Sequence, residues 1–271
     1  MSRFFLFLIV ASLIWIATMT FHSDTNRANS SNHAAIRVLE KNKEWNGMKY
    51  VNVMDDFSKG LNPYIWEVLV REENFNNELQ YYSDYNVSVQ EGVLQLTGKK
   101  ESKGGKDFTS GLIHTSNEYP ILYGHIKMRA KYPVGKGLFP AIWLAPISND
   151  DYIPEVDIME VIGSQPNKIY FVHHYRNASG NIQTVYESRE IMNNDVFHTY
   201  ELIWTKDKLE WLVNGVTTFR TEENIPNIPM KLIINLAIGG DWPGSPTSST
   251  KFPAVFHIDS VEILHEKWVN N

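Results

Sequence analysis

The feature that most constrains the fold is a succession of short segments rich in β-branched and aromatic residues, separated by turns. They include "NVSVQEGVLQLTG" (86–98), "YGHIKMRAKYP" (123–133), "FPAIWLAP" (139–146), "KIYFVHHY" (168–175), "KLEWLVNGVTTFR" (208–220) and "VFHIDSVEIL" (255–264). Helical periodicity is almost absent, and such segments favour strands. Asn214-Gly215 and Glu91-Gly92 indicate hairpin turns, because these residues tolerate positive φ. The pattern predicts an all-β fold, either a sandwich or a closed barrel, and for a domain of roughly 220 residues we expect a two-sheet β-jelly-roll sandwich.

The first 22 residues have the layout of an export signal, with an apolar run over residues 4–21 behind Arg3. Because no small-x-small cleavage site follows cleanly and the run is just long enough to cross a bilayer, a membrane anchor is the alternative. Residues 23–45 are polar and are interpreted as a tether. We therefore expect one folded domain over residues 46–271, either secreted to the extracellular space or anchored to the outer face of the cell membrane.

Charge and cysteine content narrow the class of protein. The formal net charge is −6 and no block of Lys or Arg is present, which argues against nucleic acid as a partner. The chain has no cysteine, so burial of a core must hold the domain together in place of disulfides. We expect the protein to be a monomer.

Three carboxylates interrupt an apolar strand in "PEVDIMEVIG", residues 154–163. On a flat strand, alternation puts Glu155 and Asp157 on one face and Glu160 on the other. One extra residue, a β-bulge, would bring Glu160 onto the face of the other two. Two Glu carboxyls about 5 to 5.5 Å apart are what retaining glycoside hydrolysis requires. The alternative is an ordinary solvated strand face with no chemical role.

The stretch "EVDIME" resembles the active-site signature of glycoside hydrolase family 16, and Met159 matches the extra residue of its bulged, laminarinase-like branch. The segments "NNELQYYSD", "TSGLIHT", "FHTYELIW", "LIINLAIGGDWPG" and "FPAVFHIDSVEIL" fall in the family's order, and the resemblance covers about residues 50–265. It implies a jelly roll with a concave substrate cleft. It also implies that Glu155 is the nucleophile, Glu160 the general acid/base, and Asp157 the residue that positions and tunes them.

The resemblance further implies substrate-binding side chains that stack on sugar rings or bond to their hydroxyls: Asn77, Arg129, Phe139, Trp143, Tyr152, His174 and Trp242. Phe139 and Tyr152 stand where the family usually has tryptophan, so the stacking surface is kept but an indole N–H donor is lost. Trp242, in the turn "GGDWPG", is the best individual candidate, because a Trp in a turn has little core to fill. For the other residues the alternatives are core packing, a salt bridge or a structural turn.

One structural calcium ion is also implied by the resemblance, with the carboxylate of Asp259 and the carbonyl of Gly92 as ligands. Calcium prefers oxygen ligands of this kind. The alternative is that Asp259 caps a turn or pairs with a basic residue. No organic cofactor is expected.

The function expected from these residues is retaining, endo-acting hydrolysis of β-1,3-glucan, with the polysaccharide as the partner. A mixed-linkage β-1,3-1,4-glucanase or a red-algal galactanase of the agarase or carrageenase type is the alternative within enzymes. From another class, a non-catalytic β-glucan-binding module is a further alternative, although such modules typically lack the Glu pair that this chain carries.

Overall fold

The computed structural model describes residues 39–265, apart from 46–47, 73, 148–151 and 193–194. The chain divides into two units, residues 1–34 and 35–271, and all described residues belong to the second. The predicted signal or anchor over residues 1–22, and most of the predicted tether, lie outside the described residues. Within the part that is described, no helix has the length and apolar character needed to span a membrane.

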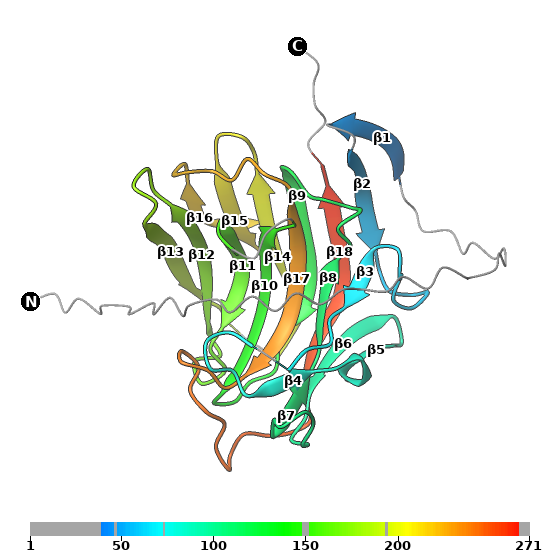
Figure 1. Ribbon diagram of the computed structural model, residues 1–271, viewed down its shortest axis with the longest axis vertical. Coiled ribbons are helices and arrows are strands. Elements are labelled where there is room, and N and C mark those ends of the chain that lie inside the picture. The colour runs from blue at the N-terminus through cyan, green and yellow to red at the C-terminus, as the bar shows by residue number, and fades with distance from the viewer. Residues whose placement is uncertain (1–38, 46–47, 73, 148–151, 193–194, 266–271) are drawn as a thin grey trace, which may run out of the picture. The chain divides into compact units, whose positions relative to one another are not determined.

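The domain is an all-β sandwich of two large sheets, as the sequence predicted (Figure 1). The seven-stranded sheet has the order β13 (Ile182–Glu190), β12 (Lys168–Arg176), β11 (Glu155–Val161), β10 (Leu138–Pro146), β17 (Met230–Ile238), β8 (Leu112–Thr115), β3 (Trp66–Val68). The main path of the nine-stranded sheet has the order β1 (Leu39–Trp45), β2 (Met48–Asp55), β18 (Ala254–Leu264), β9 (Gly124–Lys131), β14 (His198–Trp204), β15 (Leu209–Val213), β16 (Val216–Thr221). Two further strands complete this sheet: β6 (Val93–Gly98) pairs with β18, and β5 (Val87–Gln90) pairs with β6. A small parallel pair, β4 (Gln80–Tyr82) and β7 (Phe108–Ser110), and a short 3-10 helix, Asp84–Asn86, complete the described elements.

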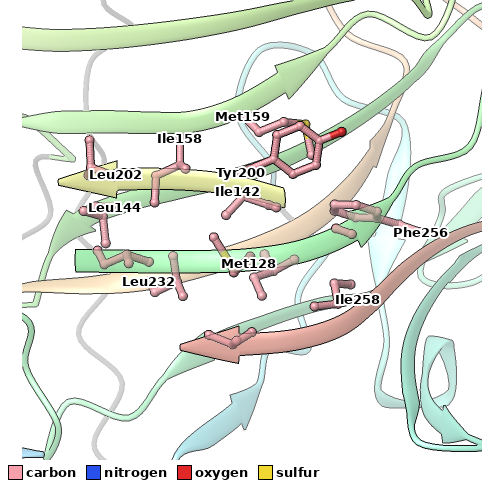
Figure 2. Close-up of a cluster of buried hydrophobic side chains, with 14 of the residues drawn as sticks. Met128, Ile142, Leu144, Ile158, Met159, Tyr200, Leu202, Leu232, Phe256 and Ile258 are labelled. Carbon is pink, nitrogen blue, oxygen red and sulfur yellow. The ribbon is translucent and has the colours of Figure 1, made fainter. Parts of the chain in front are cut away.

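The hydrophobic core lies between the two large sheets (Figure 2). Ile142, Leu144 and Leu232 from the seven-stranded sheet and Met128 and Leu202 from the nine-stranded sheet are fully buried members of it. The alternation of strand side chains then turns their neighbours to the outer face of each sheet. This division into core-facing and outward-facing positions determines which side chains can meet a ligand.

The two hairpin turns predicted from sequence are confirmed. Asn214 and Gly215 have φ of 51° and 76° and connect β15 to β16, whose residues Val213 and Val216 are paired. Glu91 and Gly92 have φ of 51° and 75° and connect β5 to β6. Positive φ at both central residues matches the right-handed twist of the flanking strands.

Strand β1 falls within residues 23–45, which the sequence predicted to be a polar tether. It pairs antiparallel with β2 at the edge of the nine-stranded sheet. Strand pairing uses main-chain groups, and a polar sequence is compatible with an edge strand. The described fold therefore begins at Leu39 and not at residue 46, while the rest of the predicted division of the chain stays a prediction.

Candidate active site

The predicted bulge is present in β11, at Ile158 and Met159. In the pairing with β10, Asp157 lies opposite Trp143 and Met159 lies opposite Ile142, so the register shifts by one residue. The pairing with β12 is interrupted over the same interval, between Asp157 and Glu160. Two successive residues of β11 therefore occupy the place of one, which is the definition of a bulge.

The bulge puts the three carboxylates on one face. Ile158 and Met159 are both fully buried in the core, whereas Glu155 and Glu160 are half-buried on the opposite side. On β12 the residues paired with Glu155, Asp157 and Glu160 are His174, Val172 and Tyr170, which share a face because they are spaced by two. We call this outward face of the seven-stranded sheet the acid face.

The environment of the three acids keeps protons on them. Burial raises the pKa of Glu155 to about 8. Burial and the charge of Glu155 raise the pKa of Glu160 to about 8. Asp157 is 2% exposed, and burial together with Glu160 and Glu155 raises its pKa well above the usual range. One Oδ atom of Asp157 is buried without a hydrogen-bond partner, so a proton shared with a neighbouring carboxyl relieves both its burial and the repulsion.

His174 lies beside the acids on β12. Its Nε2 is 3.7 Å from a carboxylate oxygen of Glu155 and 3.8 Å from one of Asp157, and its Nδ1 is 2.7 Å from the hydroxyl of Thr184 on β13. Burial and the neighbouring His173 lower the pKa of His174 to about 4, so the ring is neutral at physiological pH. His173 faces the other way, as predicted, and contacts the backbone carbonyls of Glu155 and Asn224.

The donor atoms of Glu155, Asp157 and His174 all lie within 4.8 Å of one another, a spacing that a cation could bridge. Metal binding requires deprotonated carboxylates. Burial raises the pKa values of both carboxyls, so a cation bound here would displace their protons.

An aromatic cluster flanks the acids on the side of Glu160. The ring of Trp242 packs edge-on against Tyr170, with centroids 4.8 Å apart, and against Phe139 at 5.5 Å. Tyr170 is the direct strand partner of Glu160. Trp242 remains 37% exposed, so the cluster offers an apolar surface to a ligand beside the acids.

A second aromatic cluster lies next to Asp157. Trp143, its strand partner on β10, packs against Tyr152 with centroids 5.7 Å apart, and Tyr152 packs against Phe75 at 4.9 Å. The Nε1–H of Trp143 donates to the side-chain carbonyl of Asn235 at 2.8 Å. This bond fixes the orientation of the half-buried indole beside Asp157, and the sugar-binding role of Trp143 stays a prediction.

Asn77 lies in the loop before β4, where its side-chain amide donates to the carboxylate of Asp241 at 2.9 Å. The backbone N–H of Asp241 in turn donates to the carbonyl of Asn76. The predicted substrate residue therefore joins its loop to the loop that carries Trp242, and it remains exposed there.

Arg129 does not lie on the acid face with the other candidate substrate residues, so this geometry gives its predicted substrate role no support. It lies on β9 of the nine-stranded sheet, whose core-facing residues are Met128 and Ala130, so its own side chain is on the outer surface. There Arg129 pairs with Asp259 at 2.8 Å and its guanidinium lies 4.6 Å from the ring centroid of Phe197.

The same ion pair bears on the calcium site implied by the sequence. Arg129 already supplies a positive charge to the carboxylate of Asp259, which is the alternative considered for that residue. Gly92 keeps its place in the β5–β6 turn. The residues as arranged thus fit a structural ion pair better than a cation site, and a calcium ion there stays a prediction.

Sequence reasoning missed three residues of the acid face, namely Tyr170, Tyr186 and Asn235. Tyr186 on β13 lies opposite Val172, which lies opposite Asp157, and it is 59% exposed. The signal for Tyr170 was its spacing of four residues from His174 in "KIYFVHHY", since even spacing along a strand means a shared face. No signal identified Tyr186, because its place depends on the register of β13.

The comparisons with known proteins agree with this geometry. Residues 74–254 match the family described as Glycosyl hydrolases family 16. A beta-glucanase from Rhodothermus marinus is 30% identical over 240 residues, covering 79% of this chain and 83% of that protein. Endo-1,3-1,4-beta-glycanase EglC from Rhizobium meliloti is 31% identical over 203 residues, 69% of this chain, but the chain spans only 43% of its length.

Among solved structures, the laminarinase catalytic domain from Thermotoga maritima is similar to this chain, with a TM-score of 0.72 and 28% identity. The match covers 79% of this chain and 96% of that domain. The family match, the sandwich fold and the bulged strand with its three acids lead to the same assignment. The chain belongs to glycosyl hydrolases family 16.

Proposed function

We propose that this protein hydrolyses β-1,3-glucan at internal linkages with retention of anomeric configuration. The observation that carries the proposal is the bulge at Ile158 and Met159, which gathers Glu155, Asp157 and Glu160 on one face. Laminarinases and β-glucanases among the similar proteins support the same substrate class.

In the first step, a carboxylate oxygen of Glu155 bonds to the anomeric carbon while the glycosidic C–O bond breaks. Glu160 gives its proton to the departing oxygen. In the second step, Glu160 as a carboxylate takes a proton from water, whose oxygen bonds to the anomeric carbon while the ester to Glu155 breaks. Two inversions at the same carbon give net retention.

The raised pKa values support the proposed roles of Glu155 as nucleophile and Glu160 as general acid/base. Burial raises the pKa of each Glu to about 8, and the charge of Glu155 adds to the rise for Glu160. When one carboxyl of the pair ionises, Glu160 is therefore the one that keeps its proton. Asp157 next to them is held protonated by its burial, and it can donate a hydrogen bond to a charged neighbour. His174, neutral and hydrogen-bonded to Thr184, lies beside Glu155 without adding a charge.

The aromatic clusters support a glycan as the ligand. Sugar rings have apolar C–H faces that stack on aromatic side chains, with hydroxyls at their edges. Trp242 packs on Tyr170, the strand partner of Glu160, and Trp143 is the strand partner of Asp157. A glucan bound along the acid face can therefore contact aromatic rings beside Glu160 and beside Asp157.

The test is a substrate panel of laminarin, lichenan, agarose, carrageenan and xyloglucan, with release of reducing ends measured for the full chain. We expect the highest kcat/KM on laminarin. Activity on agarose or carrageenan without activity on laminarin would refute the substrate class, and glucan binding without reducing ends would favour a binding module. A higher value on lichenan would favour the mixed-linkage alternative, which EglC supports by its name.

The remaining expectations are proposals of the same kind. We propose that the protein acts outside the cell, that residues 4–21 direct its export or anchor it, and that it works as a monomer without an organic cofactor. Detection of the protein in culture medium against the membrane fraction would separate secretion from anchoring.

A further inference from the structure

A hollow of about 830 Å³ lies apart from the acid face, between the β6–β7 connection and the loop that leads into β18. Lys99 and Lys100 line it from the first segment and Lys251 from the second. We call this hollow the lysine groove. Its basic character is hidden in the sequence, because Lys251 is remote along the chain from the other two lysines.

The three ammonium groups of the lysine groove are available to a ligand. Among the described residues, no carboxylate forms an ion pair with Lys99, Lys100 or Lys251. The acid that lines the groove, Glu101, accepts a hydrogen bond from the hydroxyl of Thr109 at 2.7 Å. A protein with a net charge of −6 thus concentrates unpaired positive charge around one hollow.

The groove also has an apolar part and a hydroxyl edge. Phe108 and Phe252 lie against each other in it, with ring centroids 5.3 Å apart, and both are half-buried. The hydroxyls of Thr247 and Ser248 belong to the same lining. Aromatic rings suit the C–H face of a sugar, hydroxyls suit its edges, and lysines suit an anionic substituent.

We propose that the lysine groove binds an anionic polysaccharide, a chain whose sugars carry carboxylate or sulfate groups. The loop between β17 and β18 carries Trp242 near its start and Lys251 near its end, so the groove and the acid face share one connection. A polymer held in the groove would keep the acid face close to neutral glucan in a mixed polysaccharide material. The negative net charge disfavours nucleic acid, whose dense phosphate charge requires a broader basic surface.

The experiment measures equilibrium binding of the full chain to polygalacturonate, dextran sulfate, laminarin and a single-stranded DNA oligonucleotide at fixed ionic strength. The test variant is Lys99→Gln/Lys100→Gln/Lys251→Gln, which removes the charges and keeps side-chain length. We expect its Kd for the anionic polysaccharide to rise at least about tenfold. Its kcat/KM on soluble laminarin should stay within about twofold, since none of the three lysines lies on the acid face.

A charge-matched control removes three lysines elsewhere, with Lys127→Gln/Lys206→Gln/Lys208→Gln on the nine-stranded sheet and its β14–β15 turn. This control should bind the anionic polysaccharide as the unmodified protein does. Binding of polygalacturonate alone would assign carboxylate as the recognised group, and binding of dextran sulfate alone would assign sulfate. Three results would overturn the proposal: an equal loss of affinity for the anionic polysaccharide in the two triple variants, tighter binding of DNA than of either anionic polysaccharide, or binding of neither anionic polysaccharide. Each of these holds whatever the result on laminarin hydrolysis.

Discussion

Replacing Glu155 by glutamine should make the folded protein more stable in alkaline solution. Burial raises the pKa of Glu155 from 4.5 to about 8, so the folded state holds a proton that the unfolded chain loses. For a pKa raised by folding, the stabilising effect is complete below pH 4.5 and disappears as the pH rises through 8. Glutamine has no proton to lose, so the free energies of unfolding of variant and unmodified protein should diverge between these values.

The expected difference follows from the pKa shift. One unit corresponds to about 1.4 kcal/mol, so the rise from 4.5 to about 8 sets an upper limit of about 5 kcal/mol. The Glu155 side chain is 24% exposed, and its proton is shared with neighbouring carboxyls, and both facts reduce the effect. We expect about 2 to 3 kcal/mol at pH 8.5, equivalent to about 5 to 10 °C in Tm.

The measurement is urea unfolding of both proteins at pH 4, 6 and 8.5 at constant ionic strength. Glu118→Gln, at an exposed residue of the loop between β8 and β9, is the control, and its effect on stability should be small at all three pH values. The reasoning would be refuted if Glu155→Gln shifted stability by the same amount at pH 4 and pH 8.5, or destabilised the protein at pH 8.5. The loss of turnover in this variant would show that the acid cluster is kept for chemistry at the expense of stability.

The other predictions concern activity. Glu155→Ala should abolish glucan turnover, and azide should restore it with a product of inverted configuration, which NMR of the released sugar would detect. Glu160→Ala should leave the rate of the first step nearly unchanged for substrates with good leaving groups, which need little protonation. An equal loss of activity on all substrates would argue against the role of Glu160 as acid. Trp242→Ala should lower kcat/KM for glucan by about 5- to 150-fold, or about 1 to 3 kcal/mol, and an unchanged value would remove Trp242 from the site. Tyr186→Ala should lower kcat/KM about tenfold on long glucans only, with Tyr186→Phe as the control that keeps the ring.

Strand β11, which carries the three acids, shows how much of the site the alternation of strand side chains can predict. Glu160 stands at an odd offset from Glu155 and Asp157, so alternation on a flat strand would have turned it into the core. Placing the Glu160 carboxylate among apolar core residues would be costly. One extra residue in the strand avoids this cost, because it turns Glu160 to the outer face. Both Ile158 and Met159 are buried, so the bulge could be predicted from the demand that two apolar neighbours face the core and three acids do not.

Tyr186 and the lysine groove could not be predicted in this way. The acid face extends to Tyr186 only because β13 pairs with β12 in one particular register, which depends on contacts across the whole sheet. The three lysines line one hollow only because the loop before β18 lies beside the β6–β7 connection. Both features depend on pairings between distant segments, and a single sequence carries little information about those.

Arg129 is a second case in which the sequence alone could not predict which segments lie together. Its alternation in "HIKMRAKYP" correctly predicts an outward-facing side chain, since Met128 and Ala130 are buried on either side of it. In a sandwich, however, each of two sheets has an outer face, and only the one formed by the strands around β11 carries the acids. Alternation identifies the face of a strand and not the sheet to which that strand belongs. On β9 the outward position meets Asp259 of β18, so the pairing of these two strands brings together the arginine predicted to bind substrate and the carboxylate predicted to bind calcium.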